Sequence, residues 1–191
     1  DQMFGGMGDD TYIVDNGADQ ARELYQNGGT DTVISSVSFT LGTYVENLTL
    51  TGSLNAAAVG NALDNIINGN GFNNVMAGGL GADVLNGGSG VDTYLFRTAA
   101  ESNAASHDTI VFEHGVDLID ISQIDANTNS AADDAFTFVG SSAFSGTAGE
   151  LRADFDENGW KIEGDTNGDG LADLVIAVIG TPSVTASDFV F

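Results

Sequence analysis

The stretch Gly60–Leu95 (GNALDNIINGNGFNNVMAGGLGADVLNGGSGVDTYL) divides into four nine-residue units that align without a gap. Each unit opens with Gly, carries Asn or Asp at its sixth position and places a large apolar residue at its eighth. A period of nine puts these residues on no single helical face, but it fits a solenoid with one tight turn and one short strand per unit. The apolar eighth positions are Ile67, Met76, Leu85 and Tyr94.

The same pattern occurs once more near the start of the chain, at Gly5–Ile13 (GGMGDDTYI). Residues Asp1–Phe4 match the last four positions of a preceding unit. We therefore expect the chain to be a fragment, with further repeats and a functional domain upstream in the parent protein.

Two units make one turn of a flattened right-handed coil, so each loop is expected to stack on the loop eighteen residues later. This arithmetic places Gly60–Asn65 over Gly78–Asp83 and Gly69–Asn74 over Gly87–Asp92. Each stacked pair is expected to hold one cation between two half-sites. Because Asn65 and Asn74 are neutral, these pairs carry one carboxylate each, and we expect them to bind more weakly than pairs with two.

The residue types in the loops suit calcium. Glycines allow positive φ and turn carbonyl oxygens inward, while Asp at the sixth position adds a hard, charged oxygen. Asp10, Asp83 and Asp92 hold that position in the units at Gly5, Gly78 and Gly87. Ordering nine residues costs roughly 9–18 kcal/mol of backbone entropy, and one buried apolar residue returns only about 1.5–3 kcal/mol. The sequence therefore predicts a roll that folds when it binds calcium.

Composition agrees with a cationic partner. The 191 residues include 28 acidic and 4 basic side chains, a formal net charge of −24, which argues against binding to nucleic acid or anionic membrane. The chain has no cysteine, and no apolar run approaches the roughly 20 residues of a membrane-spanning helix.

We predict two parts. Residues 1–98 form the roll, with repeats at 5–13 and 60–95 and a less regular, metal-free middle at 15–59. In that middle, Asp31–Ile34, Ser36–Phe39 and Asn47–Leu50 are strand-like. Thr51–Val59 keeps the register of the repeats but has Ala56 in place of the acid. The period is lost from about Ala99. Beyond it, a mainly β cap is predicted by apolar runs at Asp108–Phe112, Leu118–Ile121, Ala135–Val139, Leu174–Ile179 and Phe189–Phe191.

These residues carry a family resemblance. The nonapeptides resemble RTX calcium-binding repeats, and residues 60–191 resemble the C-terminal domain of serralysin-type secreted metalloproteases, through Asp108–Phe112, Asp117–Ser122, Phe144–Leu151 and Asp188–Phe191. The resemblance implies an all-β fold, a right-handed parallel β-roll with a β cap. It also implies export from a Gram-negative bacterium by type 1 secretion machinery that reads the uncleaved C-terminus, and an extracellular module that binds several Ca²⁺ ions and stabilises an upstream domain.

The resemblance further implies calcium ligation by loop carbonyls, and carboxylates beyond the repeats that complete the last loops. By position the carboxylates are Glu101 and Asp108. The loop residues are Gly5, Gly6, Met7, Gly8, Gly78, Gly79, Leu80, Gly81, Gly87, Gly88, Ser89 and Gly90. Several half-sites depart from the family pattern, because Asn61 and Asn70 replace the second glycine and Leu63 and Phe72 the fourth.

A second metal candidate is the loop Asp165–Asp173 (DTNGDGLAD), which resembles an EF-hand-like or dockerin-like loop. Its candidate ligands are Asp165, Asn167, Asp169, Leu171 and Asp173. The twelfth position, however, is Ile176 where an EF-hand has Glu. The alternative is an acidic hairpin turn between Trp160–Ile162 and Leu174–Ile176.

The sequence predicts no catalysis. It contains no GxSxG elbow and no cysteine nucleophile, and His107 and His114 do not form a zinc-protease HExxH pattern. We expect both histidines to be surface or loop residues. The leading hypothesis is a calcium-folding secretion module; the alternative is an adhesin terminus or a carbohydrate-binding tail like those of alginate epimerases, and a complete enzyme ranks last.

Overall fold

The structure is a computed structural model that describes residues 1–26 and 28–191, and almost all of its regular structure is β. Two compact units, Asp1–Thr93 and Tyr94–Phe191, divide the chain. Within the described residues, no helix has the length and apolar character needed to span a membrane. The first unit contains β1 Gln2–Phe4, β2 Thr11–Val14, β3 Gln20–Arg22, β4 Thr32–Ser35, β5 Phe39–Thr40, β6 Asn47–Leu50, β7 Ala56–Val59, β8 Ile66–Asn68, β9 Asn74–Ala77 and β10 Val84–Asn86.

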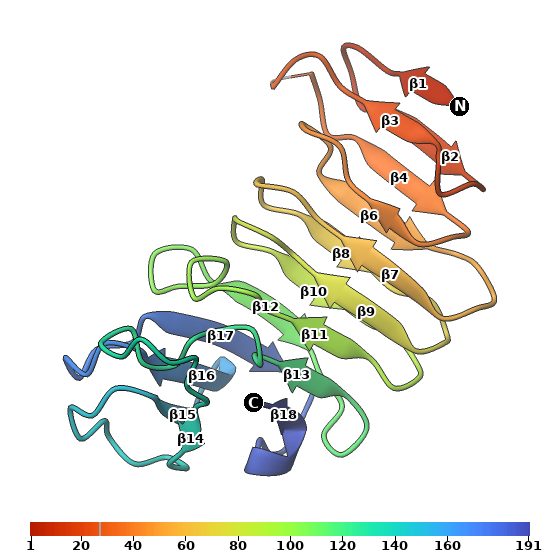
Figure 1. The fold of residues 1–191 in the computed structure, drawn as a ribbon. Helices are drawn as coiled ribbons and strands as arrows, with labels where there is room; N and C mark the ends of the chain where they lie inside the picture. The colour runs from red at the N-terminus through yellow and green to blue at the C-terminus, as the bar shows by residue number, and fades with distance from the viewer. Residues whose placement is uncertain (27) are drawn as a thin grey trace. The chain divides into compact units, whose positions relative to one another are not determined.

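The strands of the first unit pair in parallel, as a β-roll requires. One sheet runs in the order β2–β4–β6–β8–β10 (Figure 1). Another contains β5–β7–β9. In the repeats, Val84 pairs with Ile66, so successive turns are 18 residues apart. Between β2, β4 and β6 the turns take 21 and then 15 residues, because Thr11 pairs with Thr32 and Thr32 with Asn47. The all-β, parallel β-roll prediction is confirmed, and the irregular middle continues the same sheet with turns of uneven length.

The core of the roll is built from the position that the repeat reserves for large apolar residues. Ile67, Met76, Leu85 and Tyr94 are each 0% exposed. Val33 and Leu48 continue the row through the irregular middle and are also fully buried. Each such side chain contributes about 1.5–3 kcal/mol through burial.

One expected strand is displaced. The run Ser36–Phe39 was predicted as a strand, but only Phe39–Thr40 is one. Ser35 Oγ donates to Val37 O and accepts from the Val37 N–H, which bends the chain before β5. Such local side-chain bonds compete with strand pairing.

The second unit combines parallel and antiparallel strands. Its sheet runs β14–β15–β16–β17–β12, in which β16 is antiparallel to both of its neighbours, β15 and β17, and β12 is parallel to β17. Strand β13 pairs in parallel with β18 at the C-terminus. The elements are β12 Asp108–Val111, β13 Leu118–Asp120, β14 Thr137–Phe138, β15 Glu150–Asp156, β16 Gly159–Asp165, β17 Leu174–Ile179, the 3-10 helix η1 Ala186–Asp188 and β18 Phe189–Val190; β11, Thr93–Leu95, lies where the two units meet in sequence.

Glu163 on β16 is the shared acid of two ion pairs in this sheet. Arg152 and Lys161 contact its carboxylate at 2.5 and 2.6 Å. Burial alone would raise the pKa of Glu163, but the hydrogen bonds from Lys161 and Arg152 outweigh burial and hold the pKa below its usual range. The ionised form is therefore favoured in the folded state.

The lowered pKa of Glu163 predicts a pH dependence of the second unit. Because the folded-state pKa is depressed, Glu163 stabilises the fold above its unfolded pKa of about 4.3 and loses that contribution as the pH falls through the folded-state value. Glu163→Gln should therefore cost about 1–2 kcal/mol at pH 7 and distinctly less at pH 3. Urea denaturation of both proteins at the two pH values measures this, and an equal cost at both would contradict it.

Candidate metal centre

The predicted loop pairs are stacked in the way that the repeat period indicates. The backbone N–H of Asn65 donates to Asp83 Oδ1 over 2.7 Å, and that of Asn74 donates to Asp92 Oδ1 over 2.8 Å. All four residues are 1% exposed. The carboxylate of each later turn therefore lies against the sixth position of the turn before it.

Glycine is required where the stacked backbones approach. Gly79 has φ +101°, and a Cβ there would come much closer to Asn61 O than the 3.0 Å that real side chains keep. The carbonyl oxygen of Gly78 lies equally close to the position that a Cβ on Gly60 would take. Backbone oxygens thus lie between turns, where a half-site needs them.

The first repeat loop also has a stacked partner, although it is irregular. Gly8 N–H donates to Gly28 O over 2.6 Å, and Asp10 N–H donates to Asp31 Oδ1 over 2.8 Å. The second bond is the same one that joins Asn65 to Asp83. Asp31 therefore occupies the sixth position of its turn, although no complete nonapeptide surrounds it.

Three carboxylates converge beside this loop pair. Asp10, Glu23 and Asp31 each offer an oxygen, and these oxygens all lie within 4.8 Å of one another. Glu23 is 6% and Asp31 1% exposed. Asp10 Oδ2 is buried with no hydrogen-bond partner, and it points, with Glu23 Oε1, toward the space beside Gly5. We call these three residues the Asp10–Glu23–Asp31 cluster; no other group of this kind occurs among residues 1–26 and 28–191.

The surroundings of the cluster hold it in place without neutralising it. Tyr12 OH donates to Glu23 Oε1, and Gly6 N–H donates to Glu23 Oε2 over 3.2 Å. Burial raises the pKa of Asp31, and the neighbouring charges of Glu23 and Asp10 raise it further against the hydrogen bond from Asp10 N–H. Burial, followed by the bond to Glu23, raises the pKa of the Tyr12 hydroxyl as well. Three acids held this close favour either a proton or a cation.

The cluster fits a calcium ion. Its donors are hard oxygens with up to three negative charges, and the glycine-rich loop beside it brings carbonyl oxygens close. Thiolate and imidazole ligands, which transition metals prefer, are absent from the cluster. Bound calcium would supply the countercharge for Asp10, Glu23 and Asp31 and join the turn at Gly5 to the turn at Gly28.

Comparison with known proteins agrees with the β-roll fold. The family described as Peptidase M10 serralysin C terminal matches residues 1–191. The chain belongs to this family. This family is the C-terminal, non-catalytic domain of M10 peptidases.

One curated protein is similar over part of the serralysin C-terminal domain. The endo-1,3-1,4-beta-glycanase ExsH of Rhizobium meliloti (strain 1021) is 45% identical over 65 residues, which is 34% of this chain and 14% of that protein. The matched part is therefore a small section of that much longer protein.

Other predicted ligands of the serralysin domain are placed as follows. Asp108 is fully buried at the start of β12, and the hydroxyl of Ser102 accepts a bond from its N–H. Glu101 Oε2 accepts from Arg97 N–H over 2.8 Å. The side chains of Met7 and Leu80 are 74% and 50% exposed, so only their backbones are available to a site. Ligation by these residues stays a prediction.

The Asp165–Asp173 loop uses its carboxylates in hydrogen bonds. Asp165 accepts the backbone N–H groups of Asn167, Gly168 and Gly170, and Asp173 accepts from Thr166 and from the Asn167 amide. Asp169 Oδ1 accepts the Leu171 N–H. Asp165, Asp169 and Asp173 do not form a converging group in the described part of the chain. This loop joins β16 to β17, and metal binding there stays a prediction.

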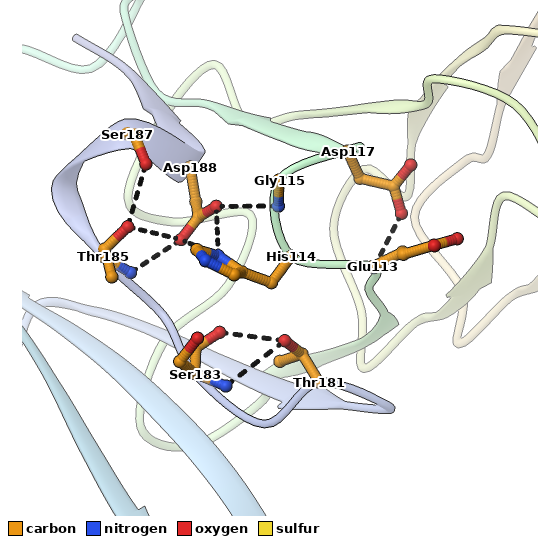
Figure 2. Close-up of polar contacts among 9 residues, drawn as sticks. All are labelled: Glu113, His114, Gly115, Asp117, Thr181, Ser183, Thr185, Ser187 and Asp188. Atoms are coloured by element: carbon orange, nitrogen blue, oxygen red, sulfur yellow. Dashed lines mark hydrogen bonds and ion pairs between the residues drawn. The ribbon is translucent and has the colours of Figure 1, made fainter.

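The C-terminal residues of the serralysin domain are part of its fold. Asp188 is 1% exposed, and its carboxylate lies 2.8 Å from His114 Nδ1 and accepts from Thr185 (Figure 2). Phe189, next in the chain, pairs with Ile119 of β13. His114 thus joins a loop to the C-terminus, while His107 is exposed.

Loss of the His114–Asp188 contact should loosen this end of the second unit. Asp188→Asn removes the charge that faces His114 and Thr185, at an expected cost of about 1–2 kcal/mol. Asp133→Asn, at an exposed position, is the matched control for the loss of one charge. Thermal unfolding of the two variants tests the prediction, and equal unfolding temperatures would contradict it.

Sequence analysis missed Glu23 as a candidate ligand and named Asp31 only as part of a strand. A partial signal was present, because Gly28–Gly29 followed by Asp31 and an apolar strand is a shortened form of the repeat. Glu23 has no such signal, since its position depends on the path of the irregular turn between β3 and β4.

Proposed function

We propose that this chain is a calcium-binding folding module of a secreted protein. The observation that carries the proposal is the Asp10–Glu23–Asp31 cluster, in which two buried acids and one buried, unpartnered oxygen converge. Uncompensated carboxylates this close repel one another and are costly to bury. A divalent cation turns the same arrangement into a link between turns.

The stacked repeat loops are the reason to propose several further calcium ions. Asp83 and Asp92 are buried between turns whose glycine backbones approach closely. Each occupied site, made of two half-sites, would stabilise the roll by about 2.7 kcal/mol at a calcium concentration 100 times its dissociation constant. Several such sites make the folded state depend on the calcium concentration.

Membership of the serralysin family suggests where this dependence matters. At cytosolic calcium the chain stays loosely structured and suited to export by type 1 secretion machinery, which reads its C-terminus. Outside the cell calcium completes the roll, which then stabilises the domain to which it is attached. The net charge of −24 supports this order, because cations reduce the self-repulsion of the folded chain.

A calcium titration of the chain tests the proposal. Circular dichroism in chelator should show reduced β signal, and saturating calcium should restore it and raise the unfolding temperature by about 10 °C or more. Magnesium at the same concentration is the control, since it prefers octahedral sites and keeps its waters. Identical unfolding temperatures in chelator and in calcium would refute calcium-dependent folding.

A further inference from the structure

Four asparagine side chains in the repeat units Gly60–Asn68 and Gly69–Ala77 reach across to the turn before their own. Asn61 Nδ2 donates to Gly42 O and Val45 O, both over 2.7 Å. Asn65 Nδ2 donates to Val45 O and Glu46 O over 3.2 and 3.1 Å. Three carbonyl oxygens of one turn are thus held by two amide groups of the next.

The following loop repeats the arrangement on the other sheet of the roll. Asn70 Nδ2 donates to Gly52 O and Leu54 O, both over 3.0 Å. Asn74 Nδ2 lies 3.4 Å from Ala56 O and also donates to Asn70 Oδ1 over 3.1 Å. The recurrence at a spacing of nine residues indicates that the contacts belong to the repeat.

The orientation of the Asn61 and Asn65 side-chain amides follows from the groups that their Oδ1 atoms face. Asn61 Oδ1 accepts Leu63 N–H and Asn65 Oδ1 accepts Asn61 N–H, each over 2.8 Å. Because each oxygen faces an N–H group, the NH₂ group must face the carbonyls. The donors therefore point into a cage of backbone oxygens.

We propose that the carboxamides of Asn61, Asn65, Asn70 and Asn74 act as built-in substitutes for cations, so that these two turns close without calcium. The comparison with cations rests on the proposed function. The chemistry is direct: an NH₂ group offers partial positive charge to the same carbonyl oxygens that would otherwise coordinate a metal ion. In both loops Asn stands at the second position, where the repeat has Gly, and at the sixth position, where it has Asp. Each replacement puts an NH₂ donor in place of a residue that suits a bound cation.

The proposal divides the first unit into segments with different calcium dependence. The Asp10–Glu23–Asp31 cluster and the loops that end at Asp83 and Asp92 require an ion. The turns at Gly42–Glu46 and Gly52–Ala56 do not, because their carbonyl oxygens already have donors. Calcium removal should then loosen the N-terminal turns and leave β6–β9 the least affected.

The decisive variant restores the calcium pattern in one loop. In Asn61→Gly/Asn65→Asp, removal of the Asn61 amide vacates a point 2.7 Å from two carbonyl oxygens, close to the 2.3–2.6 Å of calcium ligation. The second substitution adds the missing carboxylate at the sixth position of the loop. The matched control is Asn158→Asp, which makes the same change of one charge in an exposed hairpin turn.

The two proteins are compared with the wild type by calcium calorimetry and by hydrogen exchange of the full chain. The double variant should bind one more calcium ion, and in chelator the amides of β6 and β8 should exchange about tenfold faster than in the wild type. Calcium should reverse that loss. Asn158→Asp should change neither quantity. An unchanged calcium number together with unchanged exchange in the double variant would overturn the proposal.

A wild-type crystal grown in calcium gives a test that does not depend on any variant. Anomalous scattering should show no ion between Gly42–Glu46 and Asn61–Asn65, and an ion found there would overturn the proposal. This outcome differs from failure of calcium binding as a whole. A wild type that binds no calcium would refute the proposed function, while the loss of stability in the double variant would still support the role of the amides.

Discussion

Gly79→Ala should lower the free energy of unfolding by about 3 kcal/mol, measured by urea denaturation in calcium. Two effects combine at this position. The backbone has φ +101°, where a side chain costs about 1–2 kcal/mol. A Cβ would also press against Asn61 O, so the stacked turns would have to separate. Separation moves carbonyl oxygens away from the predicted half-site, and calcium affinity should fall in parallel.

Two other loop glycines separate these effects. Gly71 lies in a loop with open space around it and has no positive φ, so Gly71→Ala should change stability by less than about 0.5 kcal/mol. Gly6 has φ +102° but also open space, so Gly6→Ala should cost only the strain of about 1–2 kcal/mol. If Gly79→Ala is no more harmful than Gly6→Ala, close stacking of the turns is not what that glycine serves.

The regular part of the roll was predictable because the nine-residue period determines both which residues face the core and which residues lie in the loops. Ile67, Met76 and Leu85 are buried as the eighth position required, and Val84 pairs with Ile66 at the expected spacing of 18. One rule, that two units make one turn, was enough to bring Asn65 onto Asp83.

The irregular middle was less predictable because its turns differ in length. Between β2 and β4 the offset is 21 residues, and between β4 and β6 it is 15, so no fixed spacing relates Asp10 to Asp31 or Asp31 to Glu46. The contacts are nevertheless the same, since Asp31 N–H donates to Glu46 Oε2 over 2.8 Å. Burial also raises the pKa of Glu46. The row of acids that bond from one turn to the next therefore continues one turn beyond the cluster.

In the second unit the apolar runs found most strands but missed β15. That strand, Glu150–Asp156, alternates buried Leu151 and Ala153 with charged residues, and short alternation in an acid-rich chain is easily overlooked. Its partner β16 was recognised only through Trp160–Ile162. The antiparallel hairpin of β15 and β16 was therefore not predicted from the sequence.

Glu23→Gln should change the stability of the first unit in opposite directions with and without calcium. In chelator, loss of one charge removes repulsion from Asp10 and Asp31 and the cost of burying an ion, a gain of about 1 kcal/mol. The amide can still accept from Gly6 N–H and bond with Tyr12, so packing is kept. In calcium the same change removes a charged ligand, and affinity at the cluster should fall about tenfold or more.

The sign reversal is what separates a calcium site from a group of acids that happen to lie together. Glu157→Gln, at an exposed hairpin position, controls for the change in net charge and should move stability little in either buffer. Urea denaturation of the wild type and of both variants, in chelator and in calcium, gives the change in unfolding free energy of each variant in each buffer. If Glu23→Gln were stabilising in both buffers, the cluster would bind no calcium; if it were destabilising in both, Glu23 would serve through its bonds to Tyr12 and Gly6 rather than through its charge.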